Sequence, residues 1–158
     1  MNQPELLHES SPRYDKPVIA AVIGSLMALD IAFILFFPEV LWFMLVTTFL
    51  ELALFYFIVP RRYQIFSDRL RVVLGGPVKF DVPFSTVKIV RPAQGLDTFI
   101  YWGLRMATSF EGVVEIVRRG GGLDMVISPY DRDTFMEQFE QALAASDRNA
   151  TPPKWRIV

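Results

Sequence analysis

The sequence contains no cysteine and only one histidine, His8. Disulfides, thiolate metal sites and cysteine nucleophiles are therefore excluded. His8 lies in a proline- and charge-rich N-terminal segment, where we expect a solvated side chain rather than a member of a catalytic triad or metal cluster. Residues 120–122 are three glycines, but the Lys-Ser/Thr that completes a phosphate loop does not follow them. We therefore expect a protein that is not an enzyme and holds no cofactor or metal ion.

Lysine and arginine are missing from residues 18–59. The only charged residues in this region are Asp30, Glu39 and Glu51. Two apolar runs of 20 residues, 18–37 and 40–59, are separated by two residues, and each is about 30 Å long as a helix, which matches a hydrocarbon core. Neither run keeps the polar face that a helix of a soluble protein needs. The sequence therefore predicts an antiparallel transmembrane helical hairpin.

Basic residues flank the two runs only at their outer ends. Arg13 and Lys16 precede the first run, and Arg61 and Arg62 follow the second, whereas the turn between the runs has no basic residue. Positively charged flanks stay in the cytoplasm. We therefore expect a multi-pass protein of the cytoplasmic (plasma) membrane with both termini in the cytoplasm, in which residues 1–17 are an N-terminal tail.

Short alternating segments begin after the second run. They are separated by Gly, Pro, Ser and Asp residues that are typical of turns. We expect strands at residues 63–66, 70–74, 78–82, 86–90, 113–118 and 123–128. Arg119 and three glycines join the last two segments and indicate a β-hairpin. A looser aromatic region, residues 97–110, lies before that hairpin.

The last periodic segment, residues 131–145, predicts an amphipathic helix. Its apolar residues share one face: they are Phe135, Met136, Phe139, Ala142 and Leu143. Asp131 or Asp133 can cap the N-terminus. An antiparallel sheet of about seven strands, curled into a barrel and plugged by this helix, would bury both apolar surfaces. We therefore predict an α+β domain at residues 61–145, followed by a C-terminal tail at residues 146–158.

Three stretches resemble bacterial membrane proteins with a pleckstrin-homology (PH)-like domain. They are RRYQIFSDRLRV, GLR at residues 103–105, and VVEIVRRGG leading into ISPYDRDTFMEQFEQAL. Many such proteins carry a pair of transmembrane helices directly before the domain, and the resemblance covers residues 18–145. It implies a seven-stranded PH-like barrel with a C-terminal helix. It implies no catalytic residues, because most of these proteins have no assigned activity.

Four arginines follow the second apolar run: Arg61, Arg62, Arg69 and Arg71. One interpretation is that they determine membrane topology. The other is that they bind anionic lipid, in which case each contributes about 1 kcal/mol near a membrane surface. PH-like folds bind phosphoinositides through the loop between their first two strands. Here that loop is residues 67–69, which is too short to clamp a headgroup.

Two acids lie within the predicted spans, where a charged side chain costs about 2.5–3.5 kcal/mol. Folding the hairpin about its turn places Asp30 level with Thr47, next to Thr48, and Glu51 close to Ser25. One interpretation is that neutral carboxyls form hydrogen bonds that hold helices together, within the chain or between subunits. The other is that an oligomer conducts protons or ions.

The predicted function is that of a non-enzymatic interaction or scaffolding module on a membrane anchor, an accessory subunit of a larger complex. The expected partners are membrane lipids and other membrane proteins or further copies of the chain. A net charge of −1 does not favour nucleic acid. The tail residues Trp155, Ile157 and Val158 are candidate docking residues. Alternatives are a sensor of anionic lipid and a small channel or transporter subunit that uses the two acids.

Overall fold

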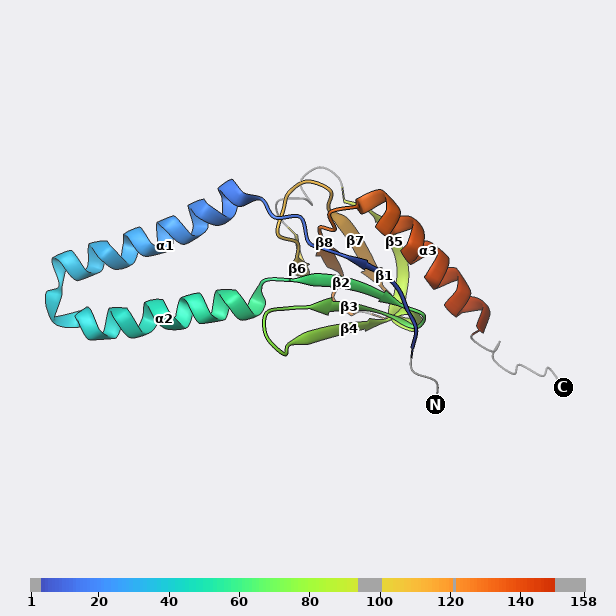
Figure 1. The fold of residues 1–158 in the computed structure, drawn as a ribbon, viewed down its shortest axis with the longest axis horizontal. Helices are drawn as coiled ribbons and strands as arrows, with labels where there is room; N and C mark the ends of the chain where they lie inside the picture. Colours follow the sequence, from blue (N-terminus) through green and yellow to red (C-terminus); the bar gives the residue numbers. More distant parts are fainter. Residues whose placement is uncertain (1–3, 94–100, 121, 150–158) are drawn as a thin grey trace.

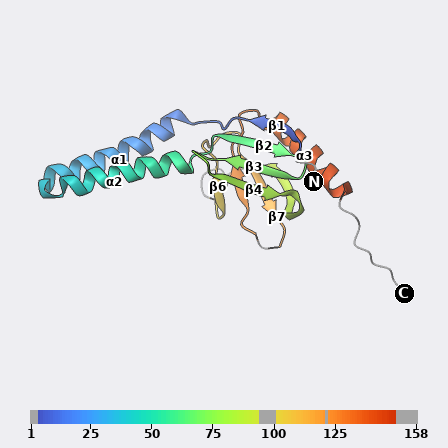
Figure 2. The ribbon, with the colours of Figure 1, turned by 60° about the horizontal axis from the view of Figure 1, so that its bottom comes forward.

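The computed structural model describes residues 4–93, 101–120 and 122–149. Two long helices, α1 (Lys16–Phe36) and α2 (Leu41–Ile58), project side by side from one end of a β domain (Figure 1, Figure 2). The short 3₁₀ helix η1 (Pro38–Val40) turns the chain between them. Both helices are long and apolar enough to cross a membrane. The predicted helical hairpin is therefore confirmed as a structure, and it indicates a membrane protein.

Four antiparallel strands form the first sheet, in the order β1-β2-β3-β4. Their bounds are Leu6–Ser10 for β1, Arg62–Phe66 for β2, Arg69–Val73 for β3 and Lys79–Pro83 for β4. The last three agree with the predicted segments. Alternate residues of these strands face the core, because successive side chains of a strand point to opposite sides of the sheet. Tyr63, Ile65, Leu70, Val72 and Val82 are accordingly buried.

The first strand corrects the expectation of an N-terminal tail. Residues 6–10 pair with β2, so that the hairpin is inserted between two neighbouring strands of one sheet. The sequence LLHES does not alternate between apolar and polar residues, and both of its leucines are largely exposed. Its place in the sheet depends on backbone hydrogen bonds, which leave no hydrophobic pattern in a sequence.

The second sheet has the order β5-β7-β8-β6. Its strands are β5 (Val87–Pro92), β6 (Leu104–Met106), β7 (Val114–Arg118) and β8 (Met125–Ile127), and the 3₁₀ helix η2 (Phe84–Thr86) precedes it. The predicted hairpin of β7 and β8 is confirmed. The expectation of an all-antiparallel sheet is wrong, because β6 lies parallel to β8. β6 and β7 flank β8 on opposite sides. The chain therefore crosses from one side of β8 to the other between β6 and β7, and β6 forms the edge of the sheet.

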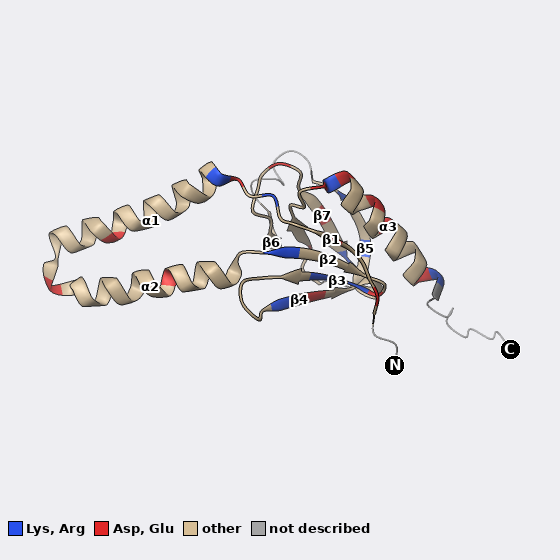
Figure 3. Cartoon of the chain, viewed as in Figure 1, with Lys and Arg blue, Asp and Glu red and all other residues tan. Residues whose placement is uncertain are grey.

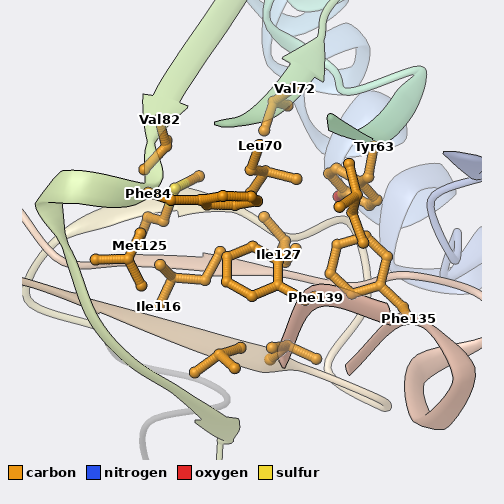
Figure 4. Packing of buried hydrophobic residues seen from close by; sticks show 14 of the residues in the cluster. Tyr63, Leu70, Val72, Val82, Phe84, Ile116, Met125, Ile127, Phe135 and Phe139 are labelled. Atoms are coloured by element: carbon orange, nitrogen blue, oxygen red, sulfur yellow. The ribbon is translucent and has the colours of Figure 1, made fainter. Parts of the chain in front are cut away.

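The core lies between the two sheets and the C-terminal helix α3 (Arg132–Asn149), as the packed side chains in Figure 4 show. The predicted apolar stripe of α3 is confirmed: Phe135, Phe139 and Ala142 are buried, and Met136 and Leu143 pack against the core. The domain is thus α+β with the helix last. Among the described residues, the strand pairings give two four-stranded sheets and do not close a barrel.

Candidate functional site

The carboxyl group of Asp30 lies between α1 and α2, where the residue is 8% exposed. Thr48 Oγ1 lies 2.5 Å from Asp30 Oδ2 and 2.8 Å from the carbonyl oxygen of Met44. One hydroxyl proton cannot serve both acceptors. Thr48 Oγ1 therefore donates to one of these acceptors at a time, and its position links the Asp30 carboxyl group on α1 to the backbone of α2. The expected partner Thr47 instead donates within its own helix, 2.9 Å from the Met44 carbonyl oxygen.

Glu51 lines the same small cavity as Asp30 and Thr48, which has a volume of about 20 Å³. A cavity of this size holds one water molecule. Unlike Asp30, Glu51 is exposed on the surface of the hairpin. Within residues 4–93, 101–120 and 122–149, its carboxyl group has no hydrogen bond or ion pair. The hydroxyl of Ser25 does not reach it and donates to the Val22 carbonyl oxygen, 2.9 Å away.

The four candidate arginines do not form one basic surface. Arg69 and Arg71 both bind Asp81, Arg71 through two hydrogen bonds of 2.7 and 2.8 Å. The hydrogen bond from Arg71 is the main cause that lowers the pKa of the Asp81 carboxyl below its ordinary value. Arg62 lies 3.2 Å from a Glu9 oxygen. Most of this charge is therefore neutralised within the first sheet.

Distance from the hairpin also separates these arginines. The backbone of Arg61 donates to the Val73 carbonyl oxygen (2.7 Å), which places that end of β3 next to α2. Arg69 begins the same strand, about 13 Å farther away at 3.3 Å per residue. Lys79 pairs with Val73 and so lies at the hairpin end of β4. The sequence did not single out Lys79, because its position follows from strand register. Figure 3 shows that charge is scarce on both long helices and frequent on the β domain.

The β domain is fastened to both helices of the hairpin. Before α1, the Asp15 backbone amide donates to the Thr108 carbonyl oxygen (3.1 Å). After α2, the Tyr14 hydroxyl donates to the Pro60 carbonyl oxygen (2.6 Å), and the Arg61 guanidinium lies 4.9 Å from the centre of the Tyr56 ring. These contacts tie the start of α1 to the end of α2 and to the segment that follows β6.

A pocket of about 220 Å³ lies at this junction. The two helices with the residues that follow α2, β6 and the segment after β6 line it: Val18, Ile19, Val22, Phe55, Ile58, Val59, Pro60, Arg105, Met106, Ala107, Thr108, Ser109 and Phe110. Arg105 is the one charged residue among these. Its Nη1 atom is buried and has no hydrogen-bond partner within the described residues. Burial accordingly lowers the pKa of Arg105.

Sequence reasoning did not select Arg105 as a functional residue. It belongs to the GLR stretch, which carried part of the PH-like resemblance, and it falls in the aromatic region where the strand pattern is weakest. A single arginine in such a region has no spacing signal that marks it as a binding residue. Only the fold brings it beneath the ends of the two helices.

His8 is not a solvated tail residue, which corrects the expectation from sequence. Its Nε2 atom lies 2.9 Å from Asp131 Oδ2, and Ser10 Oγ donates to the other oxygen of the same carboxylate. The Asp131 side chain therefore fastens β1 to the start of α3. Because the carboxylate lies between the imidazole and the hydroxyl, the arrangement does not make Ser10 a nucleophile.

No cluster of three metal-binding side chains occurs in the described parts of the chain. The candidate docking residues Trp155, Ile157 and Val158 lie outside the described residues. Comparisons with protein-family models, with curated proteins and with solved structures found no match.

Proposed function

We propose that this protein is a non-enzymatic subunit of a membrane assembly, whose hairpin binds other membrane helices and whose β domain serves as an interaction or scaffolding module. The observation that carries the proposal is the carboxyl group of Glu51. It is exposed on α2, and no group in the described residues bonds to it. The partners are either other proteins or further copies of this chain.

Glu51 favours binding of another helix because a polar group without a hydrogen-bond partner has a high free energy in hydrocarbon. Glu51 lies seven residues before the end of α2, about 10 Å inside that end of the helix. At that depth lipid offers no hydrogen-bond donor or acceptor, whereas a neighbouring helix does. A second helix beside Glu51 therefore satisfies the carboxyl group and explains why an acid is kept on an otherwise apolar surface.

Strand pairing supports a topology with both ends of the hairpin on one side of the membrane. β1 precedes α1 and β2 follows α2, and these two strands pair directly. Lys16 and Arg61 flank the same ends of the helices and favour the cytoplasmic side. In this proposal the β domain lies in the cytoplasm, against the inner face of the membrane.

The order of elements also supports the PH-like interpretation of the β domain. Two small sheets enclose one core and a C-terminal helix packs against it. The domain also has apolar surface available to a partner: Trp102 is 96% exposed and Tyr130 74%. Aromatic side chains of this kind are enriched where proteins bind one another.

A photo-crosslinking experiment in membranes tests the proposal. A photoreactive amino acid at position 54 lies on the same face of α2 as Glu51, and one at position 49 lies on the opposite face. We expect intermolecular protein adducts from Leu54 and not from Phe49. The Leu54 adduct should disappear in Glu51→Leu and persist in Glu51→Gln, since the amide still forms hydrogen bonds. Equal adducts from both positions, or none from either, would contradict the proposal.

A second candidate function is proton transfer within an oligomer. What favours it is that Asp30 and Glu51 line one cavity large enough for a water molecule. This function and helix association predict different results for amide substitutions. Proton transfer requires a titrating group, so that Glu51→Gln would be as damaging as Glu51→Leu.

A further inference from the structure

The pocket between the hairpin and the second sheet combines two opposite surfaces. Residues of α1 and α2, among them Val18, Val22 and Ile58, form apolar walls. Arg105 and Ser109 lie on the side of the pocket formed by the β domain, where they supply polar groups. The described lining residues include no acid, so the charge of Arg105 is not compensated within the pocket.

Two residues that line this pocket, Arg105 and Ser109, carry a hydrogen-bond donor that lacks an acceptor within the described residues. The first is Nη1 of Arg105, which is buried. The guanidinium is otherwise held by a long contact of Nη2 with the Ser109 carbonyl oxygen (3.4 Å) and by the Phe110 ring, 5.0 Å away. The second is the hydroxyl of Ser109, which accepts a hydrogen bond from the Glu111 amide (3.0 Å) and whose own proton reaches no described acceptor. Ser109 is 4% exposed.

We propose that this pocket binds an anionic phospholipid of the surrounding membrane, with its phosphate at Arg105 and Ser109 and an acyl chain between α1 and α2. A buried donor without an acceptor destabilises a protein, and a cation without a counter-ion does so more strongly. Phosphate oxygens supply both the acceptors and the negative charge. The apolar walls supply the matching surface for hydrocarbon.

The position of the pocket explains why the ligand comes from the membrane. Its walls are the ends of two helices that expose apolar side chains to lipid: Val22 is 44% exposed and Ile58 57%. An acyl chain can therefore enter from the bilayer without crossing water. The pocket lies at the ends of the helices next to the flanking residues Lys16 and Arg61, which is the depth of lipid headgroups.

The test uses the full chain, purified in a mild non-ionic detergent, and native mass spectrometry to measure bound lipid. Phosphatidylglycerol and phosphatidylcholine of equal chain length are compared, with inorganic phosphate and a free fatty acid as separate arms. We expect phosphatidylglycerol to bind and to raise the melting temperature, and phosphate alone to do neither. Stronger binding of the fatty acid or of phosphate than of phosphatidylglycerol would overturn the proposal.

Two variants locate the binding in this pocket. Arg105→Gln removes the charge and should weaken binding of phosphatidylglycerol by about tenfold or more, as expected for the loss of a charge-assisted hydrogen bond. Arg62→Gln is the matched control, because Arg62 is exposed and paired with Glu9. Unchanged binding in Arg105→Gln, or an equal loss in Arg62→Gln, would contradict the assignment.

The third variant, Val22→Trp, keeps Arg105 and narrows the apolar wall. It should also reduce lipid binding, and it provides the test if Arg105→Gln does not fold. Full binding of phosphatidylglycerol by a folded Val22→Trp protein would show that the acyl chain lies elsewhere.

Discussion

Gly75 packs directly against the backbone of Tyr56: a β carbon on Gly75 would lie 1.8 Å from the Tyr56 carbonyl oxygen. This contact joins the turn after β3 to the last turn of α2. The next residue, Gly76, has a φ of 66° and lies against the Phe57 ring. The two glycines therefore allow the β domain to touch the hairpin backbone, which a side chain at position 75 would prevent.

Gly75→Ala should separate this turn from α2 and destabilise the protein by about 1–3 kcal/mol, the usual cost of an overpacked site. The measurement is thermal unfolding of the full chain in detergent. Gly24→Ala is the control, because a β carbon at Gly24 meets nothing within 4 Å and alanine favours a helix. A melting temperature for Gly75→Ala as high as that of the control would show that the turn does not hold the helix.

The buried hydroxyl of Tyr63 predicts a loss of stability at alkaline pH. It donates to the Met106 carbonyl oxygen (2.6 Å), and burial raises the pKa of Tyr63 above its ordinary value of 10.0. The folded state therefore keeps a proton that the unfolded state loses. This contribution to stability is complete below pH 10 and falls as the pH rises toward the folded-state pKa, by up to about 1.4 kcal/mol per pH unit.

Chemical unfolding of the full chain as a function of pH measures this effect. Tyr63→Phe should lower stability at neutral pH by about 1–3 kcal/mol, because the Met106 carbonyl loses its donor, and should flatten the decline above pH 10. Burial also raises the pKa of Tyr14, so that Tyr14→Phe serves as the comparison. An unchanged alkaline slope in Tyr63→Phe would assign the effect to other groups.

The hydrogen bond between Thr48 and Asp30 predicts a ranking of variants within the hairpin. Asp30→Asn can still bond to the hydroxyl and should leave the association of the two helices nearly intact. Asp30→Leu and Thr48→Val should each weaken it by about 0.6–2 kcal/mol. Thr47→Val is the matched control, since that hydroxyl bonds within its own helix. The readout is the abundance and resistance to unfolding of the full chain in membranes, and equal losses in both threonine variants would contradict the prediction.

Insertion of the hairpin between two paired strands predicts that a shortened chain folds in water. Residues 4–12 joined to residues 61–149 by a short Gly-Ser linker should retain both sheets and α3, because Ser10 pairs with Tyr63. Residues 61–149 alone should melt at a lower temperature, since Asp131 loses both His8 and Ser10. Circular dichroism and thermal melting of the two proteins provide the comparison. Equal melting temperatures would mean that β1 contributes nothing to the domain.

The sequence predicted those elements whose side chains carry a periodic signal. Two uninterrupted apolar runs identified the hairpin, and alternation located most strands. The stripe that includes Phe135 and Phe139 identified α3 and the face that it buries. In each of these elements, the apolar side chains face one continuous apolar environment. Hydrophobic periodicity in a sequence reports this kind of burial.

Elements held by backbone or by single long-range contacts were missed. β1 pairs across a large insertion, and β6 has only three residues, all partly exposed. The sequence placed Asp30 level with Thr47, whereas its hydrogen-bond partner is Thr48. Counting residues from the turn gives the depth of a residue but does not fix the rotation of a helix about its axis. Arg105 had no pattern at all. That its Nη1 atom is buried without a hydrogen-bond partner among the described residues follows only from the three-dimensional structure.

The place of β1 in the sheet makes synthesis order important for folding. β1 leaves the ribosome before either helix, whereas its partner β2 appears after both. Glu9 of β1 and Arg62 of β2, whose side chains form an ion pair, are 53 positions apart. In the proposed topology, the first sheet cannot be completed until the nascent chain has entered the bilayer and returned to the same side. If the second helix failed to return, β1 and β2 would lie on opposite sides of the membrane and could never pair. Under this topology, completion of the β domain would record successful insertion, and a protease that attacks unpaired strands would remove chains in which insertion failed.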